Sequence, residues 1–412
     1  MSAFESSLQG ELESLRRQGL RRELRRIDSA PGPRVQSGGG TLLNFSSNDY
    51  LGLAGHPAVR EAALQAVRDF GAGAGAARLI CGSLAPHHDL EDDLAAFKGT
   101  PAALAFSSGY AAAVGTISAL LGPEDYILID RLVHACCVDA ARLCGAKLRV
   151  FRHNDPGDLE RILQWARARS TATAGAPGAR APRILIVTES VFSMDGDLAP
   201  LRDIVELKDR HGAWLMLDEA HATGLFGERR CGLAEATGVA DRVEVQMGTL
   251  GKALGASGGY IAGSRSLIDL LVHRARSFIF STAPPPAAVG AARAGLRLVS
   301  SPEGAALRQT LWQRVDEAKN ALIRAGRALA PVQSPIVPIP VGAEDAAVQL
   351  AAQLRGRGLL IPAIRYPTVA RGEARLRLTV SAAHRPGDLQ ELERAFLGLP
   401  FSPSPDAPAG PA

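Results

Sequence analysis

Residues 184–220, ILIVTESVFSMDGDLAPLRDIVELKDRHGAWLMLDEA, decide the fold of this chain. They begin with an apolar run at 184–188, continue into a helical pattern at 201–211 and end in a second apolar run at 214–217. The helical pattern places its apolar residues on one side, as a helix that covers a sheet requires. A strand, a helix and a second strand in this order predict a parallel sheet covered by helices.

The same alternation extends outward and predicts an α/β fold with two domains. A large domain over residues 41–283 is expected to hold a mostly parallel sheet. After three consecutive prolines, two long helical patterns and short strands predict a smaller α+β domain over residues 284–400. We expect residues 1–40 to form an N-terminal helical segment with a helix over 4–27, and residues 401–412 to be a disordered tail. The other candidate strands are 103–106, 126–129, 148–151, 243–247 and 260–262.

Composition and charge exclude several classes of protein. Of the 412 residues, 46% are hydrophobic and 21% charged, which excludes an acidic disordered chain. The net charge is +4 and the arginines are scattered, so we expect no nucleic-acid partner. Five cysteines without a CxxC pair predict reduced thiols, no metal site and a cytoplasmic protein. We expect neither a signal peptide nor a membrane span.

Lys252 is the most informative of the five lysines. It lies in residues 248–259, GTLGKALGASGG, just after an apolar strand, among small neighbours that allow a ligand to approach closely. A desolvated lysine has a lowered pKa and can form a Schiff base with a carbonyl. Taken alone, the stretch is more typical of a glycine-rich loop with an exposed lysine.

Two further features favour the chemical interpretation. Asp218 follows an apolar strand, where a carboxylate can hold the ring nitrogen of pyridoxal phosphate protonated. Residues 107–110, SSGY, precede a helix whose free N–H groups can bind a phosphate. Singly, Asp218 could be a helix cap, His221 a satisfied polar residue and SSGY an ordinary turn. Their combination with Lys252 favours a pyridoxal-phosphate site.

The motifs then show a resemblance to a known family. Residues 249–258, TLGKALGASG, match the pyridoxal-phosphate attachment signature of class II aminotransferases and their relatives. With four other stretches, they make roughly residues 12–398 resemble an α-oxoamine synthase. Those stretches are 44–53 (NFSSNDYLGL), 187–197 (VTESVFSMDGD), 218–224 (DEAHATG) and 281–285 (STAPP).

The resemblance implies a fold type I homodimer with active sites shared between subunits. Residues 361–384 most resemble the family member that joins L-alanine to pimeloyl-CoA, or to a pimeloyl-carrier protein, in biotin biosynthesis. A glycine-using α-oxoamine synthase and a plain aminotransferase remain as alternatives. A ligand-sensing regulator would need a DNA-binding domain, for which the first 40 residues are too short.

The resemblance also implies a role for each matching residue. Lys252 would bind the cofactor and then act as the base, Asp218 would pair with the ring nitrogen, and His134 would stack on the ring and assist catalysis. The other implied cofactor contacts are Gly109, Tyr110 and Thr249 at the phosphate, Ser193 and His221 at the phenolic oxygen, and Ser281 and Thr282 from the partner subunit.

Substrate contacts follow from the same resemblance. Arg365 would bind the amino-acid carboxylate in a bidentate pair, near Thr368, Asn48 and His134. An arginine of the N-terminal helix would contact the acyl substrate, and we favour Arg22 over its neighbour Arg21.

Overall fold

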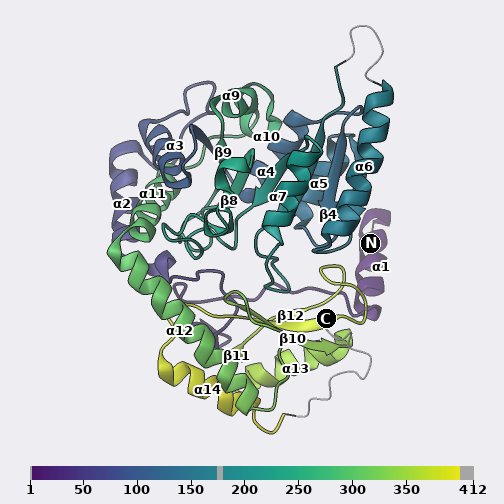
Figure 1. The fold of residues 1–412 in the computed structure, drawn as a ribbon. Coiled ribbons are helices and arrows are strands. Elements are labelled where there is room, and N and C mark those ends of the chain that lie inside the picture. The colour runs from purple at the N-terminus through teal and green to yellow at the C-terminus, as the bar shows by residue number, and fades with distance from the viewer. Residues whose placement is uncertain (1, 174–179, 400–412) are drawn as a thin grey trace. The chain divides into compact units, whose positions relative to one another are not determined.

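The computed structural model describes residues 2–173 and 180–399, which form two compact units (Figure 1). The central unit comprises Asn48–Ser193 and Asp197–Thr310, and the terminal unit comprises Met1–Ser47, Met194–Gly196 and Leu311–Ala412. The tail predicted at 401–412 lies outside the described residues.

The boundary between the two units lies later in the chain than the domain boundary that we expected after residue 283. The prolines at 284–286 do not end a domain, because Pro286 opens helix α11 (Pro286–Ser300), where the missing N–H of proline does no harm. This helix packs against α2 (Pro57–Phe70) and α3 (Ala85–Lys98), so it belongs to the central unit.

The central unit is built on a mostly parallel sheet of seven described strands. Their order is β3-β9-β8-β7-β6-β4-β5, and β9 runs antiparallel to both of its neighbours. The inner strands are buried on both faces, as an apolar parallel sheet requires. The strands are β3 (Ala102–Phe106), β4 (Tyr126–Asp130), β5 (Lys147–Phe151), β6 (Ile184–Glu189), β7 (Trp214–Asp218), β8 (Val245–Thr249) and β9 (Gly259–Gly263).

Helices cover both faces of this sheet (Figure 1). Helices α4 and α5 pack together with α9 and α10 over one apolar face, and α6 and α7 pack together over the other. The remaining helical bounds are η1 (Leu53–Gly55), α4 (Gly109–Leu120), α5 (Ala135–Leu143), α6 (Pro156–Thr173), α7 (Leu201–Arg210), α8 (Leu233–Ala236), η2 (Ala240–Arg242), α9 (Arg265–Arg274), α10 (Arg276–Ile279) and α12 (Pro302–Arg324), which crosses into the terminal unit.

The terminal unit holds two small sheets, of order β1-β2-β11 and β10-β13-β12. Its first helix is shorter than expected: α1 (Ala3–Arg17) stops where Gly19 takes a left-handed φ of 68°, so Arg22 does not lie on a helix. The other elements are β1 (Arg34–Ser37), β2 (Gly40–Asn44), β10 (Ile336–Gly342), α13 (Glu344–Gly356), β11 (Leu359–Leu360), β12 (Ala363–Ile364), β13 (Ala374–Thr379) and α14 (Pro386–Phe396).

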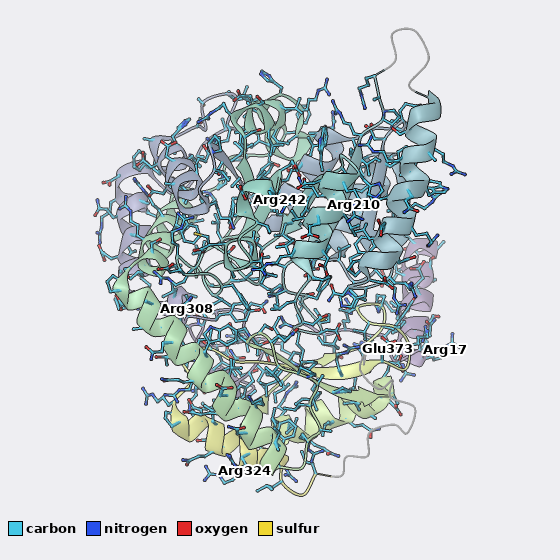
Figure 2. All side chains as sticks on the ribbon, viewed as in Figure 1. Arg17, Arg210, Arg242, Arg308, Arg324 and Glu373 are labelled. Carbon is cyan, nitrogen blue, oxygen red and sulfur yellow. The ribbon has the colours of Figure 1, made fainter. Side chains whose placement is uncertain are left out.

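Figure 2 draws the side chains and labels five arginines in different parts of the chain, and several arginines form ion pairs with carboxylates. In the central unit Arg210 binds Glu160 at 2.7 Å and Arg242 binds Asp209 at 2.5 Å. In the terminal unit Arg324 binds a glutamate of α14 at 2.6 Å. In the described part of the chain, no helix combines the length and the apolar character that crossing a membrane would need.

Candidate active site

Lys252 lies in a hydrogen-bonded chain with two other side chains of the central unit. Its Nζ is 2.7 Å from Nε2 of His221, whose Nδ1 is 2.5 Å from the hydroxyl of Tyr50. The loop that carries Lys252 follows β8 and closes on itself, because Leu250 exchanges backbone hydrogen bonds with Ala256 and Gly258. The half-buried amine is thereby held against an imidazole, and not extended into solvent as on an exposed loop.

Asp218 and Glu189 are a buried pair of carboxylates at the ends of neighbouring strands. They are register partners of β7 and β6, so their side chains leave the sheet on the same face. Asp218 accepts a hydrogen bond from the N–H of Ala220 at 2.8 Å. Burial and the charge of Asp218 raise the pKa of Glu189 to about 8, although the charges of Lys252 and His134 oppose the rise. A cationic group beside Asp218 would therefore also meet Glu189, whose raised pKa favours the protonated acid at neutral pH.

His134 caps the start of α5 and contacts a thiol. Its Nδ1 accepts a hydrogen bond from the N–H of Cys136 at 3.2 Å and lies 3.0 Å from the Sγ of the same residue. This contact with Cys136 raises the pKa of His134. The thiols of Cys136 and Cys137 and a carboxylate oxygen of Asp218 all lie within 4.8 Å of one another. The start of α5 therefore brings His134 close to the two buried carboxylates.

The start of α4 and the end of β8 form the predicted phosphate site. Ser108 caps α4 through a hydrogen bond from Ala111, and the other first-turn N–H groups of a helix are free for an anion. Thr249 lies beside this turn, since a Cβ placed on Gly109 would be 3.8 Å from the Cβ of Thr249. A Cβ on Gly259 would be 2.5 Å from the nitrogen of Gly109, so only glycine allows this approach.

The remaining predicted cofactor residues are Tyr110, Ser193, Ser281 and Thr282, and fewer contacts relate them to the Lys252 site. Tyr110 is half exposed and donates a hydrogen bond to Asp139 at 2.9 Å, which directs its hydroxyl to α5. Ser193 is buried just after β6. Thr282 pairs with Ala77 in an isolated bridge, and Ser281 directly precedes it.

The predicted substrate residues divide between the two units. Asn48 belongs to the central unit, where its carbonyl accepts a hydrogen bond from the N–H of Tyr50. Arg365 and Thr368 belong to the terminal unit, and Arg365 donates a hydrogen bond to the carbonyl of Arg21 at 2.7 Å. Arg22 is exposed directly after this contact.

Sequence reasoning gave no role to Tyr50, Glu189 and Cys136. Tyr50 and Glu189 lie inside residues 44–53 and 187–197, which carried the resemblance, and this position is the signal that could have identified them. Their contacts with His221 and Asp218 come from segments far apart in the chain. Cys136 had no signal beyond its position two residues after His134.

Comparisons with known proteins show the family of this chain. The family model for aminotransferase class I and II matches residues 40–396. The chain is 50% identical to an 8-amino-7-oxononanoate synthase of Anaeromyxobacter dehalogenans, covering 97% of this chain and 96% of that one. It is 47% identical to the synthase of the same name from Geobacter sulfurreducens, over 95% and 97% of the two chains.

A solved structure has a similar fold. Serine palmitoyltransferase from S. paucimobilis, with bound PLP–myriocin aldimine, superposes with a TM-score of 0.86 at 28% identity, covering 96% of this chain and 98% of that one. A family match over most of the chain, close relatives of nearly full length and a shared fold lead to one conclusion. This chain belongs to the aminotransferase class I and II family.

Proposed function

We propose that this protein is a pyridoxal-phosphate-dependent enzyme that condenses L-alanine with a pimeloyl thioester to form 8-amino-7-oxononanoate. The relatives that carry the name of this synthase are 45–50% identical over 92–97% of the chain. The observation that carries the proposal is the Lys252 amine, held 2.7 Å from His221 in the same unit as Asp218 and the α4 turn.

The residues present fit pyridoxal phosphate. Lys252 offers the amine, Asp218 offers a buried carboxylate for the ring nitrogen, and Gly109 with Thr249 offers a phosphate site. Gly259 supports the fit to pyridoxal phosphate, because a Cβ at this position would collide with the α4 turn that forms the phosphate site. When bound, the cofactor supplies an aldehyde for Schiff-base formation and a ring that accepts the electron pair of a substrate carbon.

The chain's own groups then hold and move the protons. A neutral Lys252 amine can take the proton from the alanine Cα and later return one, and His221 holds that amine in place. Tyr50 fixes the His221 ring from its other nitrogen, which keeps Nε2 turned to Lys252. Asp218 is proposed to pair with the ring nitrogen of the cofactor, and His134, which caps the start of α5, is proposed to contact the reacting groups.

In the proposed reaction, each bond that forms is matched by a bond that breaks. A bond forms between the alanine Cα and the thioester carbonyl carbon, and the thiolate leaves with a proton. The alanine carboxylate leaves as CO2, and a proton replaces it on Cα. Arg365, with Thr368 and Asn48, is proposed to bind the carboxylate before it leaves, and Arg22 to contact the acyl substrate.

We further propose a cytoplasmic homodimer in which the partner subunit supplies Ser281 and Thr282 to each site. Free thiols at all five cysteines, including the adjacent Cys136 and Cys137, are consistent with a reducing compartment. The acyl donor is pimeloyl-CoA or a pimeloyl-carrier protein, and a glycine-using reaction is the alternative that the assay must exclude.

Thiol release tests the proposal. Purified protein is given pimeloyl-CoA with L-alanine or with glycine while the cofactor absorbance is recorded. We expect release with L-alanine, and a loss of at least about a hundredfold in Lys252→Ala. Lys319→Ala, which removes a partly exposed lysine of α12 that pairs with Asp316, is the matched control and is expected to keep full activity. Thiol release with glycine alone would show that the amino-acid substrate is glycine. A protein that binds no cofactor would refute the assignment as a pyridoxal-phosphate enzyme.

A further inference from the structure

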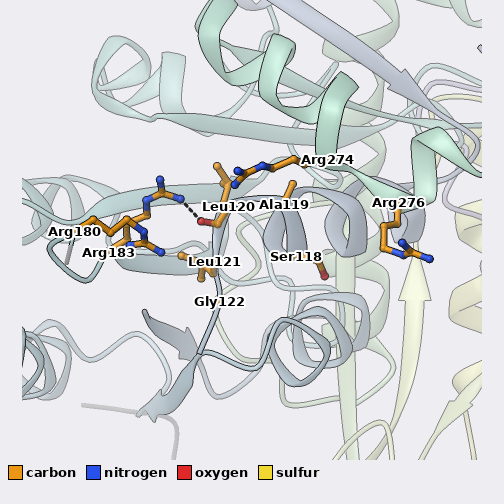
Figure 3. A pocket seen from close by; sticks show the side chains of 9 residues that line it. All are labelled: Ser118, Ala119, Leu120, Leu121, Gly122, Arg180, Arg183, Arg274 and Arg276. Atoms are coloured by element: carbon orange, nitrogen blue, oxygen red, sulfur yellow. Dashed lines mark hydrogen bonds between the residues drawn. The ribbon is translucent and has the colours of Figure 1, made fainter. Parts of the chain in front are cut away.

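A second concave site lies in the central unit, at the carboxyl end of α4. The cavity has a volume of about 520 Å³, within the usual range for small-molecule sites. Figure 3 shows the arginines that line it, which come from two separate stretches of the chain: Arg180 and Arg183 precede β6, and Arg274 and Arg276 lie where α9 meets α10. Leu120 and Ser118 of α4 form part of the wall.

The arginines of this cavity outnumber the acids that face them. Arg180 binds both oxygens of Asp125 at 2.6 Å. The same two oxygens also accept hydrogen bonds from the N–H groups of Arg183 and Gly122, so the fully buried Asp125 is saturated. Asp125 therefore neutralises one guanidinium and has no lone pair directed at another.

Among the described residues, the other three guanidiniums form no ion pair with a carboxylate, although the charge of Asp125 still acts on Arg183. Arg183 donates to the carbonyl of Leu120 at 2.6 Å (Figure 3). Its guanidinium carbon also lies over the ring of Trp214, 5.3 Å from the ring centroid. Burial, and then the positive charges of Arg180 and Arg274, lower the pKa of Arg183. Between residues 2 and 399, outside the gap at 174–179, neither Arg274 nor Arg276 forms an ion pair. This contrasts with Arg210 and Arg242, which both bind carboxylates.

An uncommitted hydroxyl lies in the same wall. The Oγ of Ser118 is buried, and no hydrogen-bond partner for it exists among the described residues. The negative end of the α4 dipole would repel an anion, but Arg183 already occupies the Leu120 carbonyl. This hydroxyl is enclosed in the wall and does not itself face a ligand, so the cavity offers an anion excess positive charge at a helix end whose Leu120 carbonyl is already bonded.

This cavity is separate from the Lys252 site. The predicted cofactor phosphate lies at the first residue of α4, and the cavity lies at its last. A helix of 12 residues is about 18 Å long, so one phosphate cannot occupy both ends.

We propose that the cavity lined by Arg180, Arg183, Arg274 and Arg276 binds a phosphate-bearing small molecule that carries at least two negative charges. Guanidinium groups suit phosphate because their planar N–H donors bind its oxygens in bidentate pairs. The volume exceeds that of one phosphate, and Leu120 offers apolar surface to the rest of the ligand. The source is either an inorganic polyphosphate or a nucleotide, which share the diphosphate group.

Calorimetry with pyrophosphate and with ADP tests this proposal on protein saturated with pyridoxal phosphate, so that the α4 turn is filled. We expect both probes to bind, and Arg274→Gln and Arg276→Gln each to weaken binding at least about tenfold. Arg265→Gln removes the same charge from the other end of α9 and serves as the control. The three variants are expected to keep the wild-type melting temperature and cofactor spectrum.

Tighter binding of ADP than of pyrophosphate would identify a nucleotide site, and equal binding a site for the diphosphate group alone. The proposal fails if neither probe binds at millimolar concentration, or if Arg265→Gln weakens binding as much as Arg274→Gln does. It also fails if excess pyridoxal phosphate displaces the probe, because the probe would then occupy the cofactor site.

Discussion

His153 lies between two carboxylates, and its titration should make the central unit less stable in alkaline solution. Its Nδ1 is 2.9 Å from Asp130 and its Nε2 is 2.8 Å from Asp197, so the protonated ring donates to both. Burial alone would lower the pKa of His153. The hydrogen bonds and charges of the two aspartates outweigh that effect and raise it from 6.5 to about 9.

The size of the effect follows from the two pKa values. A tenfold change in proton affinity is about 1.4 kcal/mol, so a rise from 6.5 to about 9 corresponds to about 3 kcal/mol. Because the pKa is higher in the folded state, this stabilisation is fully present below pH 6.5. It declines as the pH rises and is lost above about pH 9.

Urea unfolding at pH 6, 7.5 and 9.5, followed by tryptophan fluorescence, measures this dependence. The wild-type midpoint should fall by on the order of 1 M urea across that range. In His153→Gln most of the fall should disappear, because the unfolded and folded chains then bind the same number of protons at this position. His273→Gln, which changes an exposed histidine of the same unit, should retain it. Equal slopes in the wild type and His153→Gln would refute the reasoning.

Two further predictions concern the candidate active site. Gly259→Ala should cost about 1–3 kcal/mol and weaken cofactor binding, because its Cβ would meet the nitrogen of Gly109 at 2.5 Å. Gly73→Ala, where a Cβ meets nothing within 4 Å, is the control, and similar melting temperatures and cofactor affinities for both variants would contradict this prediction. Glu189→Gln should be more stable than the wild type by at least about 1 kcal/mol at pH 8, and less so at pH 5. The reason is that Glu189 ionises in the unfolded chain but stays protonated in the folded chain between pH 4.5 and about 8, which opposes folding of the wild type. Urea midpoints of both proteins at the two pH values measure this difference in stability. A Glu189→Gln variant that is less stable than the wild type would show that Glu189 is not a buried acid.

The strands of the central sheet could be predicted because each one is a local pattern. Short apolar runs stand between helical patterns, and both kinds of pattern depend only on neighbours in the chain. All seven predicted strands appear within two residues of their expected bounds. The N-terminal helix was predicted too long, since the apolar spacing continues past Gly19, whose left-handed backbone ends the helix.

The candidate site was predictable only in part. Lys252 and Asp218 lie in stretches whose composition and resemblance pointed to a cofactor, and the structure brings both near Glu189 and His134. The pairing of Glu189 with Asp218 depends on β6 lying beside β7 in register, which a single chain pattern does not specify.

The sequence by itself determined the fold class, the order of strands and helices along the chain, and the lysine that identifies the site. These are local properties, fixed by the side chains of consecutive residues. Only the tertiary structure decided which carboxylate becomes a buried acid, which histidine lies between two aspartates, and which arginines line one cavity. Those outcomes depend on burial and on charges from distant segments, and both come into existence only when the sheet and its helices pack together.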